Sequence, residues 1–191
     1  FHTAFKEPVP DEEACLADLL AWAITTASAE LPSGYWFATE TQDRMVSVEA
    51  HGPENAVARL LVAVCNRSAR GGGLGHQIAE VEDRAGETPA VIVRSTDFPT
   101  TPTAAVSRQI GKLLLRGGRR VVVENADWRK MLAFRAFQNK HGQQSEFPSW
   151  QQASRPLSQL ASLRQALALD TLLKQRAAGF LPPGDGSAAA T

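Results

Sequence analysis

The sequence contains few of the residues and patterns that build crosslinked, metal-bound or membrane-embedded proteins. Its 191 residues include two cysteines, which form no Cys-x-x-Cys pair and no zinc pattern with the four histidines. No run of about 18 apolar residues is present, so the sequence offers no candidate membrane span. A signal-peptide pattern is also missing, and the default expectation is a reducing, cytoplasmic compartment.

Two common enzyme motifs are missing as well. Without a Gly-x-x-x-x-Gly-Lys-Ser/Thr segment the sequence excludes a P-loop, and without Gly-x-Ser-x-Gly it excludes the nucleophile elbow of the α/β-hydrolases. The chain starts at Phe1 rather than at a methionine. We therefore expect it to be part of a larger protein.

The zero net charge of the chain conceals an uneven distribution. Residues 1–57 carry ten acidic and two basic side chains, a net charge of −8, whereas residues 58–191 carry a net charge of +8. The densest basic stretch spans 108–140, and 15 of the 20 basic residues are arginines, which favour bidentate phosphate contacts. Two interpretations stay open, a face that binds a polyanion and a set of solvated helix faces.

Hydrophobic periodicity predicts an α/β chain. Three successive strands, followed by strands joined through helices, predict a mixed central sheet of about five strands flanked by helices, with the later strands parallel. The strand at 57–65 is almost wholly apolar and is expected at the centre of the sheet. The strands are expected at 35–41, 44–50, 57–65, 89–94 and 119–124, and the helices at 11–30, 75–84, 103–115, 125–140 and 158–178.

The leucine-rich helix expected at 158–178 follows the main α/β unit. We expect an α/β domain over 1–142, a C-terminal helical extension over 143–180 and a disordered, low-complexity tail over 181–191. The helix at 158–178 either covers the sheet or docks on a partner protein.

Two short runs flank the second predicted helix, LLVAVCNR at 60–67 and AVIVRSTDF at 90–98. Together with the order of the elements, they resemble the restriction-endonuclease-like or PD-(D/E)xK superfamily, and most closely its Mrr-like branch. The resemblance covers about residues 14–124. It implies a core of one helix, three strands, a second helix and a fourth strand, in a metal-dependent nuclease whose third strand ends in Glu-x-Lys.

The sequence departs from this family at the residues that carry the chemistry. Ala63 stands where the family has its metal-binding Glu, and Cys65 stands where it has the Lys that positions the attacking water. Alanine cannot bind a metal, and a thiol does not suit a hard cation such as Mg²⁺. The resemblance therefore implies a degenerate site near Glu49, Ala63 and Cys65 with no catalytic residue and no cofactor; Mg²⁺ is expected only if activity survives.

Acidic residues elsewhere allow another interpretation. Glu49 could replace the family's usual Asp on the second strand, and Glu30 could match the helix acid of some members. A migrated metal site would then combine Glu30, Glu40 and Glu49. For Glu49, a solvent-facing strand residue is the alternative.

A glycine-rich segment at 71–75 follows the central strand after about seven residues. This distance fits the dinucleotide fingerprint poorly, because that motif needs a tight turn directly after the strand. A flexible loop is one interpretation. With Arg67 and Arg70 beside it, the loop could also bind a phosphate through backbone N–H groups at a helix start. Cys65 ends an apolar strand and is expected to be a buried structural thiol.

Three hypotheses of function follow. The first is a catalytically inactive nuclease-like module that binds DNA or docks on a DNA-processing partner. The second is a Rossmann-like domain that senses a small ligand or nucleotide or binds a protein, and the third is a metal-dependent nuclease with a migrated site. No membrane partner is expected. Under the first hypothesis, the residues expected to bind nucleic acid are Arg67, Arg70, Arg116, Arg119, Arg120, Arg129 and Lys130.

Overall fold

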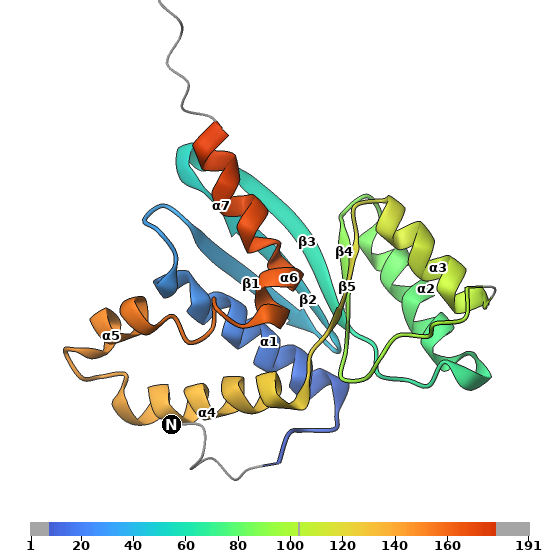
Figure 1. Cartoon of the computed structure of the whole chain (residues 1–191), viewed down its shortest axis with the longest axis horizontal. Helices are drawn as coiled ribbons and strands as arrows, with labels where there is room; N and C mark the ends of the chain where they lie inside the picture. Colours follow the sequence, from blue (N-terminus) through green and yellow to red (C-terminus); the bar gives the residue numbers. More distant parts are fainter. Residues whose placement is uncertain (1–7, 103, 179–191) are drawn as a thin grey trace, which may run out of the picture.

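A five-stranded sheet in the order β1-β2-β3-β4-β5 forms the centre of the computed structural model, which describes residues 8–102 and 104–178 (Figure 1). The first three strands pair antiparallel, and β3, β4 and β5 pair parallel. The mixed α/β sheet predicted from the sequence is therefore confirmed. The strands are β1 (Trp36–Gln42), β2 (Met45–His51), β3 (Val57–Val64), β4 (Ala90–Arg94) and β5 (Arg119–Val122).

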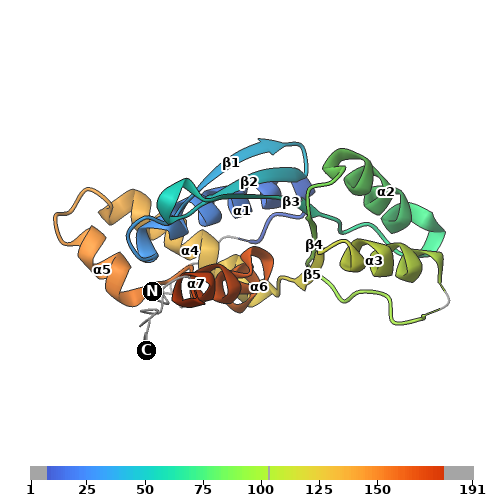
Figure 2. The same cartoon turned by 90° about the horizontal axis from the view of Figure 1, so that it is seen from above.

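Helices cover both faces of this sheet. The crossover helices α2 and α3 lie side by side on one face, and the remaining helices pack on the other (Figures 1 and 2). The α-helices of the described residues are α1 (Glu13–Ala27), α2 (Gly73–Ala85), α3 (Ala105–Leu115), α4 (Asn125–His141), α5 (Phe147–Ser154), α6 (Ala161–Leu167) and α7 (Leu169–Ala178).

The apolar run of β3 explains its central position. Val62 and Val64 face the larger core cluster with α1 and α4, whereas Leu61 and Ala63 face the smaller cluster with α2 and α3. Successive side chains of a strand point to opposite faces, so a strand buried on both sides must be apolar at every position. The expectation of a central strand here is confirmed.

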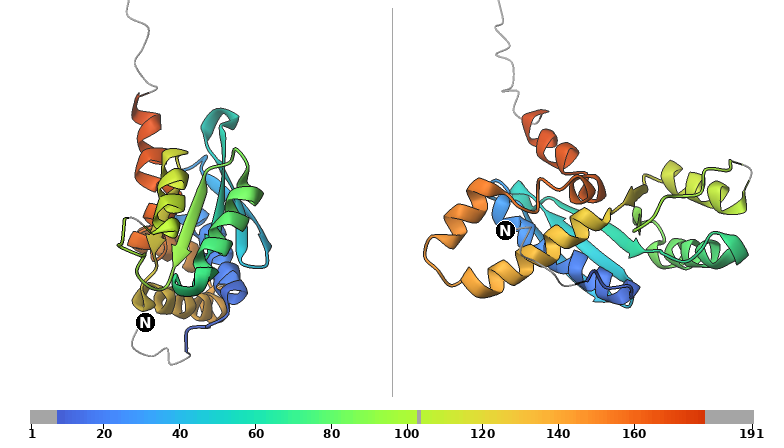
Figure 3. Two further views of the ribbon diagram at one scale, coloured as in Figure 1. Left: turned by 90° about the vertical axis from the view of Figure 1, so that its right-hand side faces the viewer. Right: turned by 60° about the horizontal axis from the view of Figure 1, so that its bottom comes forward.

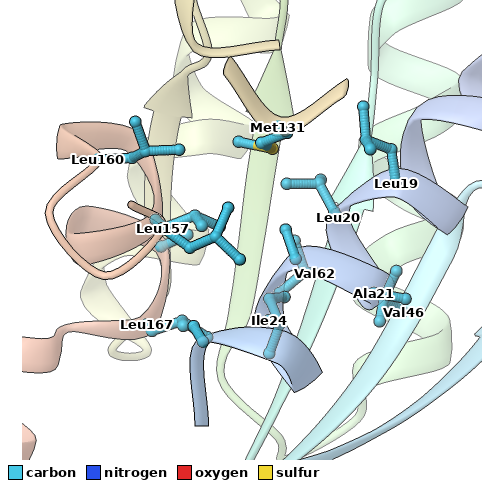
Figure 4. Packing of buried hydrophobic residues seen from close by; sticks show 14 of the residues in the cluster. Leu19, Leu20, Ala21, Ile24, Val46, Val62, Met131, Leu157, Leu160 and Leu167 are labelled. Atoms are coloured by element: carbon cyan, nitrogen blue, oxygen red, sulfur yellow. The ribbon is translucent and has the colours of Figure 1, made fainter. Parts of the chain in front are cut away.

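The C-terminal helices belong to the same core as α1. Leu157, Leu160 and Leu167 point toward Leu20 and Ile24 of α1 (Figure 4), and all five are buried. Of the two interpretations of the leucine-rich segment, covering the sheet is therefore the one that the structure supports. Its buried leucines are not free to dock on a partner.

Two expected boundaries were wrong. The single helix expected at 158–178 is two helices, because Ala168 adopts a left-handed conformation (φ 48°) between α6 and α7. Between the helices expected at 125–140 and 158–178, where no helix was expected, the chain forms α5 (Phe147–Ser154). The expected tail at 181–191 lies outside the described residues.

Figure 3 shows α2 and α3 at one end of the molecule and α5 at the other, with α4 running from beside β5 toward α5. Within residues 8–102 and 104–178, no helix has both the length and the apolar character needed to cross a membrane.

Candidate functional site

The carboxyl ends of β3, β4 and β5 meet the first turn of α1 at one end of the sheet (Figure 1). Ligands of α/β proteins commonly bind at the carboxyl ends of parallel strands, which makes this end of the sheet the candidate binding site. The side chains of six residues form a hydrogen-bond network there, linked in part through the backbone of residues 65–67. We call these residues the polar cluster: Glu13, Asn66, Gln77, Arg94, Ser95 and Trp128.

Glu13 connects α1 to the chain that follows β3. Its carboxylate accepts hydrogen bonds from the backbone N–H of Asn66 at 2.5 Å and from Nε2 of Gln77 at 2.7 and 2.9 Å. Gln77, which is 1% exposed, also accepts the backbone N–H of Arg67 at 3.1 Å through its Oε1. The loop at Asn66 and Arg67 is thus held by side chains of both α1 and α2.

A second set of hydrogen bonds joins the residues after β3 and β4 to the first turn of α4. The Asn66 side chain accepts the backbone N–H of Ser95 at 2.8 Å and donates to Ser95 Oγ at 3.1 Å. Trp128 of α4 donates its Nε1–H to the same hydroxyl oxygen at 3.1 Å. Residues that follow β3 and β4 are therefore joined to the first turn of α4, the helix that follows β5.

Arg94 is a buried cation at the end of β4, with 5% of its surface exposed. Its Nη1 donates to the carbonyl oxygens of Cys65 at 2.7 Å and Arg67 at 3.0 Å, and its Nη2 donates to Thr96 Oγ1 at 3.0 Å. Burial lowers the pKa of Arg94, but a guanidinium keeps its charge in proteins. Through its bonds to Cys65 and Arg67, this side chain fixes the backbone of the segment that follows β3.

The structure separates Glu49 from Ala63 and Cys65, the two positions at which the resemblance expects Glu-x-Lys. Met45 pairs with Ala63 across β2 and β3, whereas Glu49 pairs with Arg59. Arg59 lies four positions before Ala63, or about 13 Å along an extended strand. Glu49 Oε1 accepts a hydrogen bond from Arg59 Nε at 2.8 Å, which lowers the pKa of this carboxyl. A degenerate site that includes Glu49 is therefore not formed.

Ala63 and Cys65 are both 0% exposed, inside the smaller core cluster. Burial raises the pKa of the Cys65 thiol to about 12, even though Nη1 of Arg44 lies 3.3 Å from its sulfur. Cys65 is therefore a protonated thiol at neutral pH. The expectation that this cysteine is buried is confirmed, and it is a poor nucleophile because the thiolate is the reactive form.

The acids of the migrated site do not come together either. Glu30 is 2% exposed and accepts backbone N–H groups of Leu157 and Ser158, so it fastens the chain before α6 to the end of α1. Glu40 is exposed on β1, and Glu49 is paired with Arg59. In the part of the chain that the structure describes, no three His, Cys, Asp or Glu side chains are arranged to hold a metal.

Four of the seven basic residues expected to bind nucleic acid lie within four positions of a polar-cluster residue in the chain, Asn66 or Trp128. Arg67 and Arg70 are exposed in the loop between β3 and α2. Arg129 is exposed near the start of α4. Lys130, the next residue, has its Nζ 3.5 Å from Oδ1 of Asp127. We call Arg67, Arg70, Arg129 and Lys130 the basic rim.

The other three basic residues lie elsewhere. Arg116 follows α3 at the amino end of β5, and Arg119 uses its guanidinium inside the protein, donating to the carbonyl oxygen of Ala166 at 2.8 and 3.2 Å. Arg120 lies on β5 with its guanidinium over the ring of Phe98. The seven residues therefore do not form one surface, because the sheet separates α3 from α4.

The glycine segment has the conformation of a loop end rather than of a dinucleotide fingerprint. Gly71 and Gly72 have φ angles of +77° and +80°, which glycine adopts at little cost, and α2 begins at Gly73. Residues 65–72 separate β3 from this helix, so the tight turn required by the fingerprint is not formed.

Sequence reasoning missed Glu13, Gln77 and Arg94 as site residues. Two of them left a signal: Gln77 interrupts the buried apolar face of α2, and Arg94 ends an otherwise apolar strand. A polar residue at such a position needs a partner when it is buried. Glu13 gave no comparable signal, since acids are common in the first turn of any helix.

No protein-family model matches this chain, and no curated protein sequence matches it. The polar cluster and the basic rim are therefore the features from which a function can be inferred.

Proposed function

We propose that this chain is a nuclease-like DNA-binding module that holds the phosphate backbone at the basic rim and does not hydrolyse it. The order α1-β1-β2-β3-α2-β4 agrees with the core that the restriction-endonuclease-like resemblance implies. The observation that carries the proposal lies at the end of β3. Ala63 and Cys65 are buried there, and exposed Arg67 and Arg70 follow immediately.

The backbone at Arg67 is fixed on both sides, which favours a binding role for its side chain. Its N–H is bonded to Gln77 and its carbonyl oxygen to Arg94, while the side chain itself is exposed. A fixed backbone reduces the conformational entropy that is lost when a long side chain contacts a ligand. Phosphate oxygens are the ligands that a presented guanidinium binds best.

The chemistry at this end supports binding without hydrolysis. Cleavage of a phosphodiester by this family's mechanism needs carboxylates that hold a cation beside the attacking water. Glu13 is the acid of the polar cluster, and its two oxygens already accept hydrogen bonds from Asn66 and Gln77. The thiol of Cys65 is buried and protonated.

Two exposed acids, Asp97 and Glu124, lie at the same end of the sheet. A phosphate near Arg129 would experience the repulsion of Glu124, the second residue after β5. Glu124→Gln should therefore strengthen DNA binding at low salt, and the gain should disappear as salt screens the charge.

Fluorescence anisotropy with a labelled duplex tests the proposal. The double variant Arg67→Ala/Arg70→Ala should reduce the slope of log K against log salt by about one for each arginine that contacts a phosphate. The matched control Lys112→Ala/Arg116→Ala removes the same charge at the amino end of β5 and should leave most of the slope unchanged. Equal losses in the two double variants would contradict a specific rim.

The nucleotide-sensing alternative predicts a different result. A thermal shift with a free nucleotide, without salt-sensitive DNA binding, would favour that alternative over the proposal. The thermal shift and the anisotropy titration together therefore distinguish the two functions.

A further inference from the structure

The strand β5 forms one edge of the sheet, and half of its backbone groups point away from it. Val123 donates its N–H to the carbonyl oxygen of Arg94 at 2.8 Å, which fixes the alternation of the ladder with β4. In a parallel pair, alternate residues of a strand direct both their N–H and C=O groups to the neighbouring strand. Since Val123 bonds to β4, Val121 does so as well, and the N–H and C=O groups of Arg120 and Val122 face the open edge. Unpaired strand edges are templates for another extended chain.

A groove of about 760 Å³ runs along this edge. Arg120 and Val122, the two residues whose backbone faces outward, are the β5 residues that line it. The loop at 97–102 and Ser107 of α3 form one wall, and Gln165 of α6 forms the other.

The side chains of the groove indicate the kind of segment that it would accept. Arg120 is exposed, its guanidinium lies 5.8 Å from the centre of the Phe98 ring, and no ion pair joins it to another residue in the described ranges. Val122 projects on the same face as Arg120, two positions along the strand. Ser107 Oγ is buried and has no hydrogen-bond partner among the described residues.

We propose that this groove binds an extended segment of a partner protein, which pairs with β5 as an added strand. The outward N–H and C=O groups would bond to the backbone of the segment, as in β-strand addition generally. An acidic side chain would lie beside Arg120 and an apolar one beside Val122, so the segment carries an acidic and an apolar residue two positions apart. The loop at 97–102 on one side and Gln165 on the other leave room for a single strand. A second copy of this chain fits less well, because the same walls flank its own β5 edge.

The groove contains no residue of the basic rim, so this proposal does not depend on DNA binding. A failure here would leave the anisotropy experiment with Arg67 and Arg70 unaffected. The converse also holds, since loss of DNA binding in rim variants says nothing about the β5 edge.

Two substitutions at one position test the proposal on the full chain. Val122→Pro removes the outward N–H without removing a bond to β4, because proline is tolerated where the amide of an edge strand faces outward. The matched control Val122→Thr keeps that N–H and a β-branched side chain. Short random peptides displayed on phage are selected against the chain, and the enriched peptides are synthesised for affinity measurements by anisotropy.

The enriched peptides should carry the acidic and apolar pair and bind Val122→Pro about tenfold or more weakly, because a peptide carbonyl loses its donor. Binding to Val122→Thr should stay within about twofold of the unchanged chain. If Val122→Pro does not fold, peptides N-methylated at the amides that face β5 replace it; methylation at the alternate amides is the control.

Three results would overturn the proposal. They are the absence of enriched peptides, equal binding to the proline and threonine variants (or equal binding of the two methylated peptides), and displacement of the peptides by a DNA duplex in a salt-dependent manner. A concentration-dependent dimer whose Arg120 and Val122 amides are protected from hydrogen exchange would instead identify a second copy as the occupant.

Discussion

The hydrogen bonds between Glu13 and Gln77 should be measurable as a coupling between two helices that pack on opposite faces of the sheet. Gln77→Ala removes a buried amide that donates to both oxygens of Glu13 and accepts from the backbone of Arg67. A hydrogen bond to a charged group contributes about 1.5–3 kcal/mol, and an unsatisfied buried group costs a similar amount. We expect Gln77→Ala to lower the free energy of unfolding by about 3 kcal/mol.

The double-mutant cycle with Glu13→Ala isolates the interaction itself. Because Glu13 is partly exposed, water screens it, and the expected coupling is at the lower end of the range, about 1.5 kcal/mol. Urea unfolding of the four proteins provides the measurement. A control cycle with Asp18→Ala and Asp83→Ala, exposed acids on the same two helices, should show no coupling beyond about 0.5 kcal/mol. A Glu13–Gln77 coupling as small as that of the control would refute this account of the loop.

Three further predictions follow from burial. Leu163→Ala should lower the free energy of unfolding by about 2–5 kcal/mol in a urea titration, because this core leucine is 0% exposed. A loss under about 1 kcal/mol would mean that the C-terminal helices are not part of the core. Burial raises the folded-state pKa of Glu30, so the protonated form of this carboxyl favours folding. The unchanged chain should therefore lose stability relative to Glu30→Gln as the pH rises from about 4.5 through that raised pKa. A difference in unfolding free energy that does not depend on pH would contradict this. A thiol reagent should modify exposed Cys15 in the native protein and reach Cys65 only after unfolding, and native modification of both cysteines, detected by mass spectrometry, would disagree with the structure.

The sequence predicted the sheet well because its strands are short and strongly patterned. The apolar runs of β3 and β4 are buried on both faces, and nothing else in their composition competes with a strand. The C-terminal region was predicted less well. No Gly or Pro marks the end of α6, where Ala168 is left-handed so that Leu167 and Leu169 can both be buried. Only the tertiary core specifies that break.

The candidate site was only partly visible in the sequence. Arg67 and Arg70 could be found because they follow the central strand closely, and Ala63 and Cys65 were singled out only by the resemblance. Glu13 and Gln77 lie 64 positions apart, and their hydrogen bonds depend on how α1 and α2 reach the end of the sheet. The basic stretch at 108–140 looked continuous, but the sheet places its two halves on opposite faces.

The most direct test of the central claim measures DNA binding and DNA cleavage in the same samples. A labelled duplex is titrated with the full chain at about 50 mM and about 200 mM salt, with and without Mg²⁺, and the DNA is then examined for breaks. Our account predicts binding that weakens steeply with salt, does not require Mg²⁺ and leaves the duplex intact. Cleavage that depends on Mg²⁺, or the absence of binding at the lower salt concentration, would contradict it.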